Sequence, residues 1–217
     1  MKKYAIALVL ILLAFSGRVA LLNAQSDLSE GWEKKAMEEL QPPKKIMDAI
    51  GIKPGMIIGE IGAGRGRFTV YLAREVGPTG KIFANDIDQT SLDYLKDRCK
   101  KLRFSNVETI VGEPDDPKFP GQVLDLAFMV WTFHMIEKPD GLLSKLKTYL
   151  KPGAMLVIVD PIDSEIDHEF KIDRQDPNNK IPTITERIEK CAKASGFELV
   201  KTETFLPKDY IFILKQK

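Results

Sequence analysis

From residue 56 to the end of the chain, short apolar runs alternate with segments whose apolar residues recur at helical spacing. The apolar runs cover residues 56–58, 81–85, 107–111, 123–130 and 155–159, and two further runs, 198–205 and 210–214, end the chain as a hairpin. Strongly apolar strands that alternate with helices are typical of a parallel sheet covered on both faces. The pattern therefore predicts a doubly wound α/β fold: a seven-stranded mixed sheet with the last strand antiparallel.

Apolar stripes predict three of the helices between these strands. The stripes are formed by Phe68, Leu72 and Val76, by Leu92, Leu95, Cys99 and Leu102, and by Leu142, Leu143, Leu146 and Leu150. Gly77 is placed to end the first of these helices, and Pro43 can open an earlier helix over residues 44–50. Thr183 and Glu186 have the spacing of a capping box, which predicts the start of a last helix.

A glycine-rich turn follows the first strand, with Glu60 before Gly62, Gly64 and Gly66. A strand, such a turn and a helix start let the backbone press against a nucleotide-like ligand. Dinucleotide-binding turns have the spacing G-x-G-x-x-G and meet a pyrophosphate at the helix N-terminus. Here the third glycine comes one residue early, Arg67 follows it, and the carboxylate of Glu60 would repel a pyrophosphate. The pattern suits a cationic cofactor without phosphate.

Acidic residues follow the next two strands. Asp86 ends the second strand roughly twenty residues past the glycines, where a carboxylate can accept both hydroxyls of a ribose. Ile87 comes directly after it. The third strand ends in an acidic turn, in which Glu113 or Asp115 can accept a hydrogen bond from an adenine amine; each is equally well explained as a solvated turn residue.

The fourth strand leads into Trp131 and His134 at the same edge of the sheet. His134 is a candidate general base because the ordinary pKa of histidine lies near neutrality, although a lone histidine is more often structural. The chain contains two histidines and scattered carboxylates without metal-ligand spacing, so we expect no metal site.

With these positions in place, several runs resemble successive motifs of one enzyme family. The runs are GIKPGMIIGEIGAGRGRFTVYLA, GKIFANDID, NVETIVGEPDDPKFP, LKPGAMLVIVD and ASGFELV. They are similar to the ubiquinone/menaquinone-biosynthesis-like methyltransferases, also called methyltransferase type 11, within the class I S-adenosylmethionine-dependent methyltransferases. Bacterial members with a leader peptide are more similar still, since their chains end in a motif like FLPKDYIFIL. The resemblance covers nearly everything after residue 30.

The resemblance implies a Rossmann-like fold, S-adenosylmethionine as cofactor and methyl transfer to a small-molecule acceptor by in-line displacement. It implies that the glycine turn cradles the methionine part of the cofactor and that the acid after the second strand binds its ribose. The predicted cofactor-binding residues are Glu60, Gly62, Ala63, Gly64, Gly66, Asp86, Ile87, Glu113, Asp115 and Trp131. Trp131 stands where family members often carry Asp or Asn, and Met135 where they often carry a second histidine.

The N-terminus has the layout of a targeting segment. Lys2 and Lys3 precede an apolar run over residues 4–15, and small residues end near Ala24. We expect residues 1–24 to be a signal peptide or membrane anchor and residues 25–217 to form the methyltransferase domain. This predicts a location outside the cytoplasm, or membrane association through residues 4–15.

The overall charge gives no sign of a nucleic-acid partner, since 32 Lys and Arg balance 31 Asp and Glu. Two other functions remain open from the sequence. The first is an exported protein that binds S-adenosylmethionine without transferring its methyl group. This alternative arises because the cofactor is made in the cytosol, whereas the leader indicates export. The second is a nicotinamide-dependent oxidoreductase on the same kind of sheet, which the spacing of the glycines disfavours.

Overall fold

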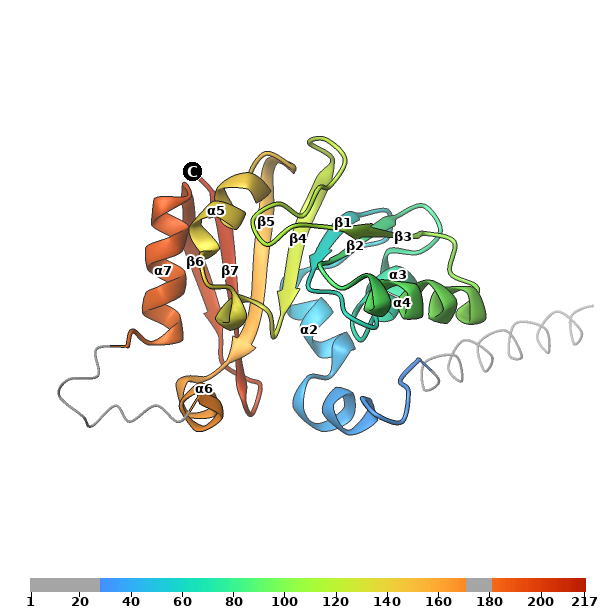
Figure 1. Ribbon diagram of the computed structural model, residues 1–217, viewed down its shortest axis with the longest axis horizontal. Helices are drawn as coiled ribbons and strands as arrows, with labels where there is room; N and C mark the ends of the chain where they lie inside the picture. Colours follow the sequence, from blue (N-terminus) through green and yellow to red (C-terminus); the bar gives the residue numbers. More distant parts are fainter. Residues whose placement is uncertain (1–27, 171–180) are drawn as a thin grey trace, which may run out of the picture.

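A computed structural model describes residues 28–170 and 181–217. They contain a seven-stranded sheet of order β3-β2-β1-β4-β5-β7-β6 (Figure 1). The strands are β1 (Ile57–Ile61), β2 (Lys81–Asp86), β3 (Val107–Val111), β4 (Leu124–Val130), β5 (Leu150–Pro161), β6 (Phe197–Glu203) and β7 (Asp209–Gln216). Strands β1 to β5 pair in parallel, whereas β7 runs antiparallel to both β5 and β6. The predicted fold class is confirmed.

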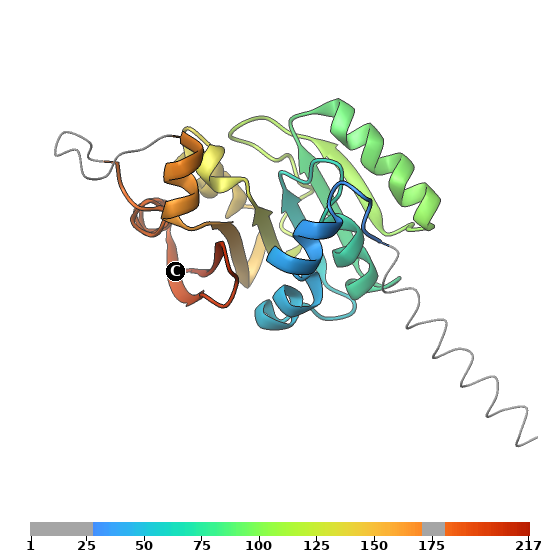
Figure 2. The same ribbon diagram turned by 90° about the horizontal axis from the view of Figure 1, so that it is seen from below.

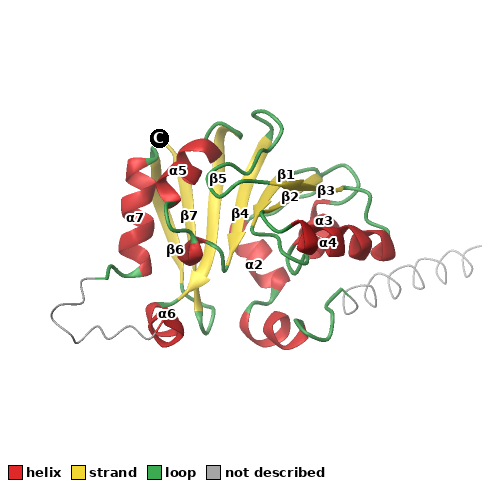
Figure 3. Cartoon of the chain, viewed as in Figure 1, coloured by secondary structure: helices red, strands yellow, loops and turns green. Residues whose placement is uncertain are grey.

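Helices cover both faces of the sheet (Figure 3). They are η1 (Ala36–Leu40, a π-helix), α2 (Pro43–Ile50), α3 (Thr69–Val76), α4 (Gln89–Leu102), η2 (Phe133–Met135, a 3₁₀-helix), α5 (Pro139–Leu146), α6 (Asp163–Phe170) and α7 (Ile184–Ala194). The predicted start and stop signals are confirmed: Pro43 opens α2, Gly77 caps α3, and Thr183 and Glu186 form the capping box of α7.

Two apolar clusters, one on each face, explain why the central strand β4 is apolar toward both faces. Helices α2, α3 and α4 pack on one face, where Phe128 of β4 is fully buried. Helices α5 and α7 pack on the other face, where Met129 of β4 is fully buried. Because successive strand residues point to opposite faces, a strand with a core on each side is apolar throughout.

The assignment of Leu150 to a helical stripe is wrong. Helix α5 ends at Leu146, and Leu150 begins β5, where it pairs with Leu124 of β4. Leu150 is fully buried in either interpretation, and apolar spacing does not distinguish a helix end from the start of a buried strand.

The carboxyl ends of the five parallel strands meet at one edge of the sheet. Figures 1 and 2 place α6 and the N-terminal segment, residues 28–41, on either side of this edge. The predicted leader, residues 1–24, lies outside the described residues. Within residues 28–170 and 181–217, no helix combines the length and hydropathy that crossing a membrane requires.

Candidate functional site

A cavity of about 780 Å³ opens at the carboxyl edge of the parallel strands. Its lining comes from the ends of β1, β2 and β4, from the turn after β3, and from η2 and the start of α5. The volume falls within the range of small-molecule sites, and the position matches the crevice in which open α/β sheets bind ligands.

Asp86, at the end of β2, holds the glycine turn in place and lines the cavity. Its Oδ2 accepts a hydrogen bond of 2.7 Å from the backbone N–H of Gly64, and its Oδ1 accepts one of 3.0 Å from the backbone N–H of Asp88. The backbone N–H of Ala63 donates to the carbonyl of Asn85 at 2.9 Å. Since each carboxylate oxygen can accept a second hydrogen bond, Asp86 can serve both the turn and a ligand.

The three glycines of the turn have different roles, although all have positive φ angles. At Gly62 (φ 73°) a Cβ would overlap the side chain of Thr132, and at Gly66 (φ 84°) it would overlap Leu95 of α4. At Gly64 (φ 52°) a Cβ would meet no atom within 4 Å. Gly62 and Gly66 therefore permit close packing within the protein, whereas Gly64 leaves open space beside the turn.

Glu60 of β1 lies behind the turn, is 3% exposed and is not part of the cavity lining. The hydroxyl of Thr69 donates to its Oε2 at 2.6 Å. Burial raises the pKa of Glu60 to about 7, although the Thr69 hydrogen bond and the charge of Arg67 act in the opposite direction. A carboxyl group with this pKa changes its charge near neutral pH.

The far end of the cavity is formed by Ile87 and the turn after β3. Ile87 is 64% exposed, which is unusual for such a large apolar side chain and leaves its surface free to contact a ligand. Glu113 and Asp115 both line the cavity, and Glu113 also forms an ion pair with Lys118. Two carboxylates and an apolar side chain thus surround this end.

Trp131 lines the cavity, but His134 does not. His134 Nδ1 lies 3.1 Å from Asp160 Oδ1, and the backbone N–H of His134 donates to Asp160 Oδ2 at 2.7 Å. Burial is the largest single influence on the pKa of His134 and lowers it, but the hydrogen bond to Asp160 and the negative charges of Asp160 and Glu169 together raise the pKa overall. Burial also raises the pKa of Asp160. The contact between His134 and Asp160 joins η2 to the end of β5 and therefore has a structural role.

Comparison with known proteins agrees with this geometry. Residues 58–153 match the model of a methyltransferase domain. The crystal structure of a SAM-dependent methyltransferase from Aquifex aeolicus superposes with a TM-score of 0.70 at 26% identity, covering 84% of this chain and 93% of that one. The chain carries a class I S-adenosylmethionine-dependent methyltransferase domain. The cofactor of this class is S-adenosylmethionine.

Two curated relatives match about half of this chain. A ubiquinone/menaquinone biosynthesis C-methyltransferase of Hydrogenovibrio crunogenus is 25% identical over 118 residues, which are 54% of this chain and 46% of the relative. A demethylmenaquinone methyltransferase of Staphylococcus aureus is 27% identical over 119 residues, covering 54% and 48%. The chain thus spans about half the length of these relatives.

The structure of the methyltransferase domain brings together most of the residues predicted from the sequence. Those lining the cavity are Gly62, Asp86, Ile87, Glu113, Asp115 and Trp131, while Glu60, Ala63, Gly64, Gly66 and His134 are not part of its lining. Gly64 is nevertheless hydrogen-bonded to Asp86, which does line the cavity.

Several residues of the lining were not predicted from the sequence, among them Asn85, Ile136 and Lys138. Asn85 carried a signal, because it is a polar residue within an apolar strand. Its buried amide donates to the carbonyls of Ile110 (3.2 Å) and Pro117 (3.1 Å), which fixes the turn after β3. Ile136 and Lys138 carried no such signal, because their place depends on the path of the chain through η2. In the described part of the chain, no group of three His, Cys, Asp or Glu side chains could hold a metal ion.

Proposed function

We propose that this protein transfers a methyl group from S-adenosylmethionine to a small-molecule acceptor by direct in-line displacement. The observation that carries the proposal is the Asp86 carboxylate, which binds the glycine turn through Gly64 and at the same time lines the cavity. A ligand beside Asp86 is therefore also beside the backbone of the turn, as a nucleoside with an attached amino acid requires.

The residues present fit the cofactor in charge and in shape. Asp86 would accept the ribose hydroxyls, and Glu113 or Asp115 would accept the adenine amine, with Ile87 against the base. The open space beside Gly64 would take the methionine part. The carboxylates of the lining favour a ligand with net positive charge, because the sulfonium and the amino group outnumber the single carboxylate.

The sulfonium supplies the electrophilic methyl group, so the protein needs only to hold the two reactants in line and exclude water. Trp131 and Thr132, at the end of β4, would flank the transferred group, and Met135 and Ile136 give the adjoining wall an apolar character. His134 is covered by its contacts with Asp160 and with the ring of Phe170, 6.3 Å away, so the proposal assigns it no proton transfer.

The curated relatives are named for methylating quinone precursors, which supports a small organic molecule as the acceptor class. Incubating the protein with S-adenosylmethionine labelled in its methyl group and with fractionated small-molecule extract tests the proposal. We expect label to enter an organic-soluble or water-soluble metabolite and S-adenosylhomocysteine to form in equal amount. Binding of the cofactor without transfer to any fraction would contradict methyl transfer and favour a binding protein.

A further inference from the structure

Trp131 has a backbone conformation that a bulky residue rarely adopts. Its φ angle is 52°, in the left-handed region, and only two other non-glycine residues of the described chain, Arg103 and Lys118, share a positive φ. The backbone N–H of Trp131 donates to the carbonyl of Val159 at 2.9 Å, which fixes this conformation where β4 ends. Strained residues persist where their surroundings over-determine them, and they cluster at functional sites.

Four side chains form a closed cycle of contacts around Trp131. Its indole N–H donates to Asp209 Oδ1 at 2.5 Å, and the amide of Gln41 donates to Asp209 Oδ2 at 3.0 Å. The guanidinium of Arg67 donates to Gln41 Oε1 at 2.6 Å. The same guanidinium lies over the Trp131 ring, 4.3 Å from its centroid, and closes the cycle. We call Trp131, Asp209, Gln41 and Arg67 the four-residue cycle.

The cycle pairs one positive with one negative charge, and its members Arg67 and Trp131 are half-buried. Gln41 and Asp209 are both 0% exposed. Burial raises the pKa of Asp209, while its hydrogen bonds from Trp131 and Gln41 favour the ionised form. Loss of any member would leave a buried polar group without its partner, which costs much more than the intact pair contributes.

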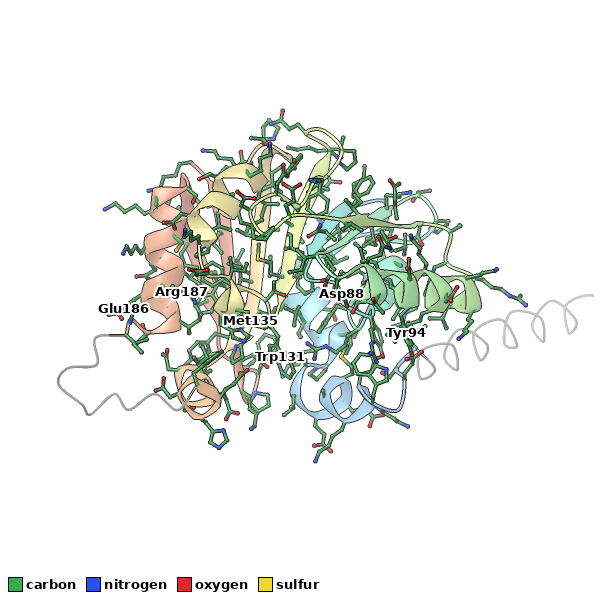
Figure 4. All side chains as sticks on the ribbon, in the orientation of Figure 1. Asp88, Tyr94, Trp131, Met135, Glu186 and Arg187 are labelled. Atoms are coloured by element: carbon green, nitrogen blue, oxygen red, sulfur yellow. The ribbon has the colours of Figure 1, made fainter. Side chains whose placement is uncertain are left out.

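Each member of the cycle comes from a different part of the fold. Trp131 follows β4, Asp209 begins β7, and Arg67 follows the glycine turn. Gln41 ends the N-terminal segment. Figure 4 shows Trp131 at the carboxyl edge, between α6 and this segment.

A second buried contact ties the N-terminal segment to the glycine turn. Arg98 of α4 forms an ion pair with Glu33, with side chains 3% and 0% exposed, and donates to the carbonyl of Arg65 at 3.2 Å. The segment is thus fastened on both sides of Gly66, through Arg65 and Arg67.

We propose that Asp209 is a positioning residue that holds the Trp131 indole in the cofactor cavity, and that the four-residue cycle makes the N-terminal segment part of this site. The proposal rests on the proposed function, since it assigns the cavity to S-adenosylmethionine. Trp131 has one ring face covered by Arg67 and its N–H taken by Asp209. Only the remaining ring surface is available to the cavity, so its orientation there depends on the cycle.

The chain contains two tryptophans, Trp32 and Trp131, so a Trp32→Phe protein reports the emission of Trp131 alone. Trp32 is 55% exposed and outside the cavity lining, so the change should be tolerated. In this background we expect S-adenosylhomocysteine to change the emission of Trp131 in a saturable way. Adding Asp209→Ala should shift the emission of the free protein to longer wavelength and weaken binding about tenfold, as expected for loss of a charge-assisted hydrogen bond.

Asp209→Asn distinguishes the hydrogen bond that Asp209 accepts from Trp131 from the one that it accepts from Gln41. Its amide oxygen can still accept from Trp131, but its NH₂ group faces the donor of Gln41, and a flipped Gln41 would instead present a donor to Arg67. We expect emission close to that of the Trp32→Phe parent, with affinity between parent and Asp209→Ala. Asn106→Ala is the matched control, because it removes a buried side chain with two hydrogen bonds, to Ala73 and Gly77, away from the cavity.

Unfolding curves and near-ultraviolet circular dichroism identify the folded variants. If Asp209→Ala does not fold, Gln41→Ala takes its place. We then also expect emission at longer wavelength and weaker binding of S-adenosylhomocysteine. Folded Asp209→Ala or Gln41→Ala protein with parental emission and affinity would overturn the proposal, as would equal changes in Asn106→Ala. If the wild-type protein does not bind S-adenosylhomocysteine, the proposed function fails, while the emission of the free variants still tests the positioning of Trp131.

Discussion

Replacing Glu60 with Gln should stabilise the free protein at alkaline pH and have little effect at acidic pH. Gln has nearly the same shape, and its amide oxygen can accept the hydrogen bond that Thr69 now donates to the carboxylate at 2.6 Å. What changes is the cost of ionising a side chain that is 3% exposed. The substitution removes that cost.

The magnitude follows from the pKa of Glu60, which burial raises from 4.5 to about 7. Because folding raises this pKa, the protonated form favours the folded state. That contribution is fully present below the unfolded pKa and is lost as the pH rises through about 7. At about 1.4 kcal/mol per pKa unit, the change amounts to roughly 3 kcal/mol between about pH 4 and pH 8.

Urea unfolding of both proteins at about pH 5 and pH 8 measures this directly. The free energy of unfolding of Glu60→Gln relative to wild type should rise by roughly 2–3 kcal/mol between these pH values. His134, Asp160 and Asp209, whose pKa values are also raised, titrate in both proteins and largely cancel in the difference. A difference that stays constant with pH would refute the assignment of a near-neutral pKa to Glu60.

Three further changes test the cofactor site and the location. Asp86→Ala should weaken S-adenosylmethionine binding by about 1.5–3 kcal/mol in isothermal titration, and unchanged affinity in the folded variant would remove Asp86 from the site. Gly64→Val should abolish binding of S-adenosylmethionine while the helical content stays close to that of the wild type. The branched side chain of valine would fill the space beside the turn and disfavours a φ angle of 52°. Retained binding would mean that the turn does not approach the cofactor. Because residues 1–24 have the layout of an export signal, we propose that the domain is exported, and we expect alkaline phosphatase fused at residue 40 and at residue 217 to be active. Intact but inactive fusions at both sites would contradict export.

The fold could be predicted because the patterns that indicate its strands and helix ends each lie within a short stretch of sequence. The central strands β1 and β4 are buried on both faces, so they appear in the sequence as apolar runs, and the helix ends carry signals such as Thr183 and Glu186. Leu150 shows where this stops: its burial was clear, but whether it ended a helix or began β5 depended on pairing with Leu124, which is distant in sequence.

The place of two residues of the cavity lining could be predicted for the same reason. Gly62 directly follows β1 and Asp86 ends β2, so both lie at the carboxyl edge of the sheet. The cycle around Trp131 could not be predicted, because Gln41 and Asp209 are separated by 168 residues and meet only once β7 lies beside β5. The contact of His134 with Asp160 is of the same kind, since it joins residues after β4 to the end of β5.

A crystal structure of the protein with S-adenosylhomocysteine is the most direct test of the cofactor site. We expect the ribose hydroxyls to be hydrogen-bonded to Asp86, the adenine to lie between Ile87 and the turn with Glu113 and Asp115, and the sulfur to lie beside Trp131. A ligand bound away from the carboxyl edge, or a ribose without contact to Asp86, would contradict the assignment of this cavity to S-adenosylmethionine.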